Sequence, residues 1–427
     1  MTTSRTGPDA GTVQARARVK GPLPLLGPAF VTAIAYVDPG NFAPNIAAGS
    51  RYGYLLVWVV IVSNLMAMLI QYLSAKAGIA TAESLPALCR RYLPRPVVRC
   101  LWVQAEVVAM ATDMAEVVGG ALALQLLFDL PLLVGGLITA AVAFALLGFQ
   151  TRGHRPFETA ITGLLAVIFA GSATTWWLEG CNRCQSSTAP SRASTAATVC
   201  CSRRALLGAT VMPHAIYLHS ALTNDRYVAD TQDQRRALLR SQRVDVIVAM
   251  TIAGLMNLAL LVLAAKLFAG DASSVDTIEG AHAALGAKLG SGAALLFALA
   301  LLASGLAASS VGTYSGQVVM EGFPRRKIPL VIRRSVTLFP SVVVLAFRVD
   351  PTKALVTSQV VLSFGIAFAL VPLVLFTRRR DVMGELTNKA LTTAVAWLVA
   401  IESPKKKLCA RSNPTPRRHR IHCETTT

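Results

Sequence analysis

The chain has 427 residues, of which 54% are hydrophobic and only 15% are charged. Soluble globular proteins carry about 25% charged residues, so this composition excludes an ordinary cytosolic enzyme. The formal net charge of +19 would suit a nucleic-acid-binding protein, but the basic residues lie between long apolar runs. That placement is typical of membrane loops beside anionic lipid. The composition therefore indicates one polytopic membrane domain, with the lipid bilayer and not nucleic acid as its surroundings.

Eleven apolar segments are long enough to be membrane spans, which need about 20 residues of helix to cross roughly 30 Å of hydrocarbon. The predicted spans cover residues 28–49, 54–78, 101–127, 130–149, 157–178, 205–222, 244–269, 289–319, 328–346, 354–376 and 386–401. We therefore expect a transmembrane domain over residues 25–401. Residues 1–24 are basic and precede an uncleaved span, which predicts a cytoplasmic tail.

Basic residues concentrate in alternate loops between these spans. They are Arg90, Arg91, Arg95 and Arg99, then Arg235, Arg236, Arg240 and Arg243, then Arg325, Arg326 and Lys327, and finally Arg378, Arg379 and Arg380. Loops rich in Lys and Arg stay in the cytoplasm. This predicts a cytoplasmic N-terminus, and the odd number of spans places the C-terminus outside.

Two spans contain a sequence in which a helix should break. The first span holds Asp38–Asn41, with the sequence Asp-Pro-Gly-Asn, and the sixth holds Met212–His214, with the sequence Met-Pro-His. Proline lacks a backbone donor and glycine is flexible. A single proline could be a harmless kink. Two breaks at matching positions of two five-span halves, each beside a titratable group, indicate an inverted-repeat transporter with its site at the midplane.

The residue types at the two breaks suit a transition-metal ion. Asp38 offers a carboxylate, Asn41 an amide oxygen, Ala209 a freed backbone carbonyl and Met212 a thioether sulfur. Mg²⁺ and Ca²⁺ prefer shells made only of oxygen, whereas Mn²⁺, Fe²⁺ and Co²⁺ accept softer ligands. The sulfur would therefore select transition metals, although Met212 could instead be apolar packing.

Three acidic residues of the third span predict a polar path. Glu106, Asp113 and Glu116 are seven and three residues apart, so they share one side of a helix. Carboxylates at membrane depth do not face lipid, and we expect them to carry protons. His214 and His219, beyond the second break, are further candidates because imidazole titrates near neutral pH.

The ninth and tenth spans hold further polar residues. Arg333 and Arg334 need counter-ions if they are buried, and Asp113 or Glu116 are candidate partners. Alternatively, both arginines could reach the cytoplasmic edge of the bilayer. Gln359 lies alone in the tenth span, where interhelical hydrogen bonding is the more common role.

The two break motifs, with the third-span acids between them, resemble the Nramp family of proton-coupled divalent metal transporters. The similarity covers residues 21–171 and 206–400. It implies an all-α, LeuT-like inverted repeat of five plus five helices and an eleventh, with helices 1 and 6 broken at the midplane. The implied activity is proton symport of Mn²⁺, Fe²⁺ and related ions across the bacterial cytoplasmic (inner) membrane. Metal ions and protons are then substrates, with no cofactor and no obligatory protein partner.

The resemblance also assigns roles to individual residues. The implied metal ligands are Asp38, Asn41, the Ala209 carbonyl, Met212 and Gln359. The implied proton route consists of Asp38, Glu106, Asp113, Glu116 and His214, together with Arg333 and Arg334.

Two stretches depart from the family pattern. Residues 172–204 are polar and rich in Ser and Thr, and residues 402–427 form an unusual basic tail. Six of the eight cysteines lie there: Cys181, Cys184, Cys200, Cys201, Cys409 and Cys423. Their spacing is poor for zinc or for a disulfide framework. We interpret both stretches as translated out of frame; if residues 172–204 are genuine, the outer half of the sixth helix is too short.

Other functions fit parts of the pattern. An amino-acid and cation carrier of the same architecture would use a helix break for its substrate but has less need of Met212. A sensor-like relative with impaired transport would fit the damaged sixth helix. A membrane metalloenzyme is not expected because the chain has no His-Glu-x-x-His motif, and no phosphate-binding Gly-x-x-x-x-Gly-Lys loop indicates ATP use.

Overall fold

The computed structural model describes residues 27–150, 206, 211–227, 231–268, 277–324 and 329–402. All the regular structure in these ranges is helical, which confirms the expected all-α polytopic fold. Three predicted features lie outside the described residues: the N-terminal tail 1–24, the fifth span 157–178 and the anomalous segment 172–204. The basic tail also lies outside them from residue 403.

The helices follow the predicted spans closely. They are α1 (Pro28–Ile34), η1 (Ala35–Val37), α2 (Pro39–Tyr52), η2 (Gly53–Leu56), α3 (Val57–Thr81), α4 (Leu85–Tyr92), α5 (Arg95–Phe128), α6 (Leu132–Gln150), α9 (Pro213–Arg226), α10 (Gln232–Phe268), α11 (Ile278–Leu289), α12 (Ser291–Gly322), α13 (Leu330–Ala346), α14 (Pro351–Arg378), α15 (Arg380–Met383), η3 (Gly384–Leu386) and α16 (Ala390–Glu402).

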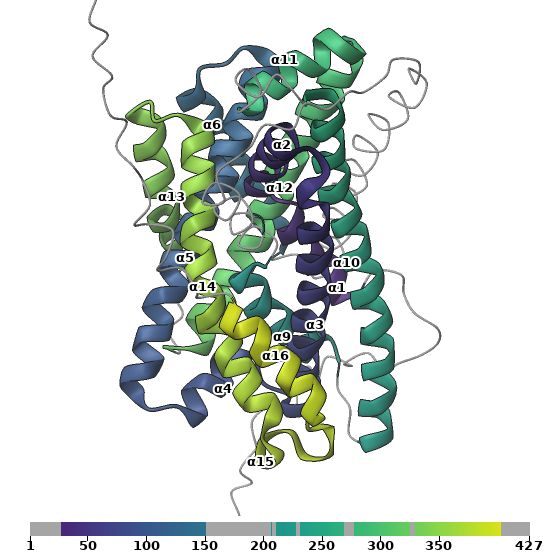
Figure 1. Ribbon diagram of the computed structural model, residues 1–427. Coiled ribbons are helices and arrows are strands. Elements are labelled where there is room, and N and C mark those ends of the chain that lie inside the picture. Colours follow the sequence, from purple (N-terminus) through teal and green to yellow (C-terminus); the bar gives the residue numbers. More distant parts are fainter. Residues whose placement is uncertain are drawn as a thin grey trace, which may run out of the picture.

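Two short helices, α4 and α11, were not predicted. Each is too short to span a bilayer, so a search for apolar segments of spanning length does not detect it. The eighth span was predicted to begin at residue 289. The observed helix α12 begins two residues later, at Ser291, because Gly290 adopts a φ of 95° and separates α11 from α12. Figure 1 shows α4 and α15 at one end of the bundle and α11 at the other.

The helices form one bundle with α1, α2 and α12 near its middle and with α10 and α13 along opposite sides (Figure 1). Within the described ranges, five helical stretches are long and apolar enough to cross a membrane. These are Pro39–Thr81, Arg95–Phe128, Gln232–Phe268, Ser291–Gly322 and Pro351–Arg378. Their outer surfaces carry large exposed apolar side chains such as Leu65 and Phe364. Such side chains are stable facing lipid tails and not water.

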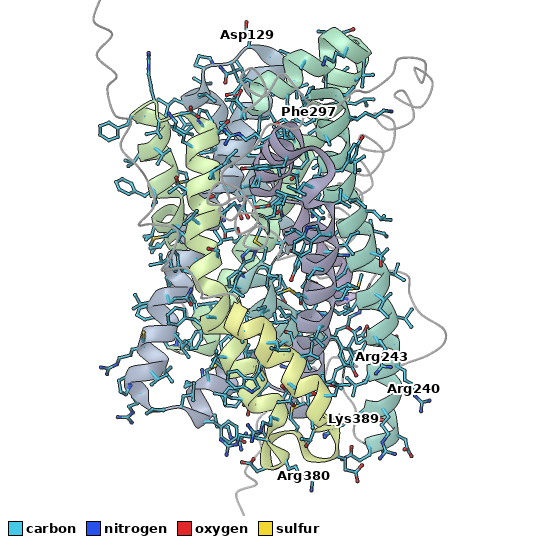
Figure 2. The ribbon with its side chains drawn as sticks, in the orientation of Figure 1. Asp129, Arg240, Arg243, Phe297, Arg380 and Lys389 are labelled. Carbon is cyan, nitrogen blue, oxygen red and sulfur yellow. The ribbon has the colours of Figure 1, made fainter. Side chains whose placement is uncertain are left out.

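Charge is distributed unevenly between the two ends. Figure 2 shows Arg240, Arg243, Arg380 and Lys389 at one end of the bundle and Asp129 at the other. Basic residues of α10 and of the α15 region, which are distant in the sequence, therefore lie at the same end of the bundle.

Small residues allow the helix backbones to approach closely. A Cβ atom on Gly305 of α12 would lie 3.2 Å from the Glu116 carbonyl oxygen of α5, and one on Gly49 of α2 would lie 2.3 Å from the Leu261 carbonyl oxygen of α10. Lipid tails are as apolar as leucine, so van der Waals packing is a main force that holds membrane helices together. These two contacts bring α12 against α5 and α2 against α10.

We expect Gly49→Ala to destabilise the bundle. The new methyl group would meet backbone atoms of α10 that cannot rotate away, and overpacking of this kind costs about 1–3 kcal/mol. Gly292→Ala is the matched control, because a Cβ there meets no heavy atom within 4 Å. Thermal melting of the detergent-purified protein should show a lower midpoint for Gly49→Ala only. Equal midpoints for the two variants would contradict the packing of α2 on α10.

Candidate functional site

The first predicted break is present between η1 and α2. Asp38 has φ −75° and ψ 163°, an extended conformation between two helical segments. The following Pro39 starts α2, where its missing N–H is not needed. The Asp38 side chain caps the new helix, since its Oδ1 accepts a hydrogen bond from the Asn41 backbone N–H at 2.9 Å. The break thus directs a carboxylate into the protein interior.

Of the second predicted break, the structure describes Met212–His214 and not residues 207–210. Met212 is extended, with φ −92° and ψ 114°, and Pro213 begins the helix. The Met212 side chain is fully buried, in the same apolar core as Tyr36 beside the first break. Ala209, whose carbonyl was a predicted ligand, lies outside the described residues.

Three buried oxygen atoms around the first break have no hydrogen-bond partner in the described part of the chain. They are Asp38 Oδ2, Asn41 Oδ1 and Gln359 Oε1. All three side chains are at most 1% exposed. Buried polar groups in proteins are almost always paired, and an unpaired one costs about 1–3 kcal/mol. These unpaired oxygens make the first break a candidate cation site.

Gln359 reaches the break because Gly40 has no side chain. A Cβ at Gly40 would lie 1.7 Å from Gln359 Nε2 and 2.9 Å from Asp38 Oδ2. The same helix, α14, contacts the second break as well, since a Cβ at Gly365 would lie 3.1 Å from a ring carbon of Pro213. Six residues of helix span about 9 Å. Gln359 therefore stands beside Asp38, on the helix that links the two breaks.

A network of amides holds the first break open. The Tyr36 carbonyl, freed from the helix, accepts hydrogen bonds from Asn41 Nδ2 at 3.0 Å and from Asn257 Nδ2 at 2.7 Å. Asn257 Oδ1 in turn accepts from Asn45 Nδ2 at 3.0 Å. Because the Asn41 amide nitrogen is occupied in this way, its oxygen is the atom left available for a ligand.

The predicted acidic residues of α5 meet the two arginines of α13. Arg334 Nη1 lies 2.5 Å from Asp113 Oδ1, and Arg334 Nη2 lies 3.7 Å from Glu116 Oε2. Arg333 pairs with Glu106 at 3.4 Å. The arginine side chains are 7% and 1% exposed, so they do not reach toward the membrane edge. The expected pairing with Asp113 and Glu116 is confirmed, and the Arg333–Glu106 pair was not foreseen.

The row of paired acidic residues on α5 and arginines on α13 starts next to the first break. A Cβ at Gly119 would lie 2.2 Å from Pro39 Cβ, so α5 touches the break one turn beyond Glu116. Glu106 and Glu116 are roughly 15 Å apart at 1.5 Å per residue. His214 Nδ1 lies 3.3 Å from Thr112 Oγ1 of α5, which brings the second break to the same row. The acids thus form a line that leads away from Asp38.

Sequence reasoning missed a second polar chain at the first break. Tyr36 Oη accepts a hydrogen bond from Gln71 Nε2 at 2.6 Å, and Gln71 Oε1 lies 2.8 Å from His219 Nδ1. His219 was a predicted proton carrier, and it lies here and not beside the acids of α5. Gln71, in a span that also holds Asn64 and Lys76, signalled a buried polar contact but not its partners.

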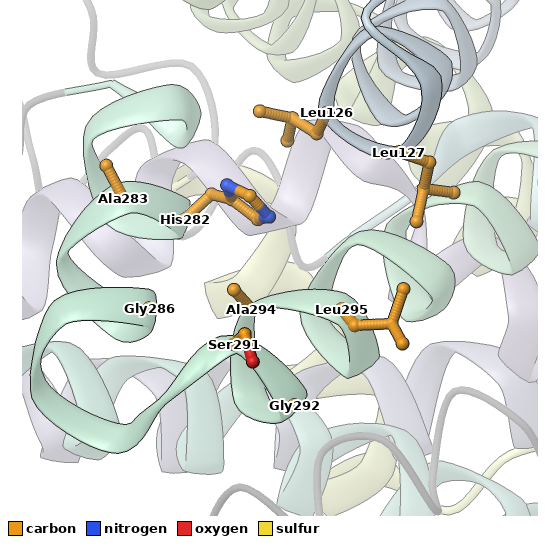
Figure 3. Close-up of a pocket in the computed structure, with 9 residues that line it drawn as sticks. All are labelled: Leu126, Leu127, His282, Ala283, Gly286, Ser291, Gly292, Ala294 and Leu295. Atoms are coloured by element: carbon orange, nitrogen blue, oxygen red, sulfur yellow. The ribbon is translucent and has the colours of Figure 1, made fainter.

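A cavity of about 580 Å³ lies at the end of the bundle that carries Asp129, between α5, α11 and α12. Figure 3 shows His282 pointing toward it, with Leu126, Leu127 and Leu295 around it. None of the residues of the two breaks lines it. Within the described ranges, moreover, no group of three His, Cys, Asp or Glu side chains is arranged to hold a metal ion. The mixed ligand set at the first break is therefore the candidate cation site.

The sequence of the chain is similar to that of known proteins. Residues 29–403 match the family model Nramp, described as natural resistance-associated macrophage protein-like. The chain is 47% identical over 385 residues to the divalent metal cation transporter MntH of Bacillus subtilis, covering 90% of each protein. It is 50% identical over 381 residues to MntH of Mycobacterium tuberculosis H37Rv, covering 88% of each. These relatives are named as transporters, in agreement with the expectation of a transporter and not an enzyme.

Solved structures give the same result. A manganese transporter of Eremococcus coleocola, crystallised with an aromatic bis-isothiourea compound, superposes with a TM-score of 0.78 and 29% identity, covering 88% of this chain and 84% of that one. The nucleobase-cation-symport transporter MHP1 has a TM-score of 0.59 at 15% identity and shares the fold alone. The LeuT-like transporter fold expected from the sequence is confirmed. The chain belongs to the Nramp family.

Proposed function

We propose that this chain is a proton-coupled symporter that carries divalent transition-metal cations, Mn²⁺ first and Fe²⁺ and related ions next, into the cell. The observation that carries the proposal is the set of three unpartnered buried oxygens at the first break. The printed names of the relatives, divalent metal cation transporter and manganese transporter, support it. The proposed location is the bacterial cytoplasmic membrane, with the N-terminus and the basic loops on the cytoplasmic side.

The proposed metal ligands are Asp38, Asn41, Gln359 and Met212, with the Ala209 carbonyl added. Carboxylate and amide oxygens suit any divalent cation. The buried thioether adds a ligand that Mn²⁺ and Fe²⁺ accept more readily than Mg²⁺ or Ca²⁺. In this proposal the oxygen ligands bind the divalent cation, and the Met212 sulfur favours Mn²⁺ and Fe²⁺ over Mg²⁺ and Ca²⁺.

Charge counting supports proton coupling along α5. Asp113 and Glu116 face one guanidinium group, that of Arg334, which leaves one negative charge uncompensated. Uncompensated charge in a protein interior is strongly unfavourable, and one proton would neutralise it. Asp38 has no cationic partner among the described residues, and the metal ion would neutralise it. In this mechanism the metal ion and the proton each balance one buried negative charge.

The proposed proton route runs from Asp38 through Glu116 and Asp113 to Glu106, with His214 beside it. Arg333 and Arg334 keep these carboxylates in place and limit their mutual repulsion. A carboxylate moves a proton to the next acceptor when the two are close and differently paired. The line of acids along α5 would supply those acceptors.

An amino-acid carrier of the same architecture is less well supported. The substrate carboxylate would have to approach the unpaired Asp38 carboxylate in a buried site, where like charges repel strongly. The sensor-like alternative depends on residues 172–204, which lie outside the described residues.

We expect Asp38→Asn to abolish metal uptake. Removing a unit charge about 4 Å from a divalent cation forfeits about 8 kcal/mol at an effective dielectric constant of 20, which is roughly six orders of magnitude in affinity. The control is Asp129→Asn, which changes an exposed acidic residue at the C-terminal end of α5. Uptake of radioactive Mn²⁺ by proteoliposomes measures both, and normal uptake by Asp38→Asn would exclude this metal site.

We expect Met212→Ala and the volume-conserving Met212→Leu to retain Mn²⁺ uptake but to weaken selectivity. Loss of the sulfur should lower the Ca²⁺ concentration that halves Mn²⁺ uptake by about tenfold, or about 1.4 kcal/mol. If only the alanine variant changes, the side chain fills space and does not act as a selective ligand.

We expect Glu116→Gln to uncouple proton movement from metal movement. The amide keeps the shape of the side chain but cannot accept the proton that neutralises the carboxylate left uncompensated beside Arg334. Proteoliposomes with an internal pH dye should show Mn²⁺ entry without acidification, and uptake should become nearly equal at two external pH values. The exposed Glu321→Gln is the control; acidification by Glu116→Gln equal to that of the parent would contradict the route.

A further inference from the structure

A second cavity, of about 450 Å³, lies at the basic end of the bundle, away from both helix breaks. It is formed by α4, the first turns of α5 and the end of α12. Figure 1 shows α4 at the same end as α15. The residues that matter for its chemistry are Arg90, Arg95, Arg99, Trp102, Met320 and Phe323. The cavity therefore joins three guanidinium groups to an apolar and aromatic wall, and none of its described lining residues is acidic.

The charge of this cavity is available for a ligand. Arg95 and Arg99 are exposed, lie one turn apart on α5 and form no ion pair within the described ranges. Arg90 donates to the Gly322 carbonyl oxygen and, at 3.2 Å, to that of Glu321, so it is held at the cavity by the end of α12. Guanidinium groups bind phosphate oxygens with two parallel hydrogen bonds. A phosphate group fits this chemistry.

The surface next to the cavity is apolar and directed toward lipid. Arg95, Arg99, Val103 and Val107 follow one another at intervals of four residues, so they lie along one face of α5. Val103 and Val107 are 54% and 49% exposed. Along α5, the guanidinium groups of Arg95 and Arg99 are therefore followed by the exposed apolar side chains of Val103 and Val107. A phospholipid presents its headgroup and its acyl chain in the same order. A soluble phosphate would make no use of the two valines.

Trp102 marks the boundary between these two parts. Its ring lines the cavity, and its Nε1 donates to Met320 Sδ at 3.3 Å. Tryptophan with one polar and one apolar side is typical of the membrane interface. The cavity thus lies at headgroup depth.

We propose that this cavity binds the phosphate of an anionic phospholipid, with an acyl chain along Val103 and Val107. Basic pockets between membrane helices are known to accept such headgroups. The assignment to the cytoplasmic leaflet rests on the proposed orientation, but the binding itself does not depend on metal or proton transport.

Quenching of Trp102 fluorescence tests this. The full chain is reconstituted in phosphatidylcholine containing either phosphatidylglycerol or phosphatidylcholine with brominated acyl chains, and Trp102→Phe supplies the signal of the other tryptophans. Brominated phosphatidylglycerol should quench Trp102 at a lower mole fraction than brominated phosphatidylcholine does. Arg95→Gln/Arg99→Gln should raise the half-quenching mole fraction at least roughly tenfold, since each basic residue contributes about tenfold or somewhat less.

The control is Arg378→Gln/Arg380→Gln, which removes the same charge from exposed positions at the same end. It should leave quenching unchanged. Equal quenching by the two brominated lipids, or an equal loss in both double variants, would overturn the proposal. Equal quenching by the two brominated lipids, together with a change of Trp102 emission on adding millimolar glycerol phosphate, would assign the cavity to a soluble phosphate and overturn the lipid. If the Arg95/Arg99 double variant melts early, the single variants Arg95→Gln and Arg99→Gln should each show part of the effect.

Discussion

A buried carboxylate without a cationic partner in the described part of the chain is the constraint on which the rest of this structure depends. Asp38 is at membrane depth, and only one of its oxygens is satisfied, by the helix that it caps. An uncompensated charge in such a place is tolerated only when something mobile can balance it. The surrounding elements keep that position open: Gly40 admits the amide of Gln359, and the amides of Asn41 and Asn257 occupy the carbonyl that the break has freed.

A second imbalance of the same size lies one helix away. Two carboxylates of α5 share one arginine of α13, and α5 touches the first break through Gly119 and Pro39. The two unbalanced charges are therefore joined by a rigid contact between backbones and not by a long side chain. A change in the position of the break is then felt by α5, which is the physical requirement for coupling one ion to the other.

The parts of the site that depend on local chemistry could be predicted from the sequence. Pro39 lacks a backbone donor and Gly40 is flexible, beside an Asp that can cap a new helix, and buried arginines need acids, so the first break and the partners of Arg334 were foreseen. The rest depends on the register between distant helices. Nothing near Gln71 indicates Tyr36 and His219 as its partners, and the Arg333–Glu106 pair follows from the angle between α13 and α5. The amphipathic helix α4 was missed because it is eight residues long and binds at the end of the bundle.

The mixed character of the proposed cation site fits cargo better than a resident metal. A cofactor metal is usually held by several His, Cys or carboxylate ligands, and the described residues contain no such group. One carboxylate with two neutral amides and a thioether attracts a divalent ion but does not supply enough charge to trap it. Passage through a membrane requires binding that is strong enough to replace water yet weak enough to release the ion. A single negative charge at a helix break meets both requirements, and a nearby sulfur can then favour one metal over another without raising the affinity for all of them.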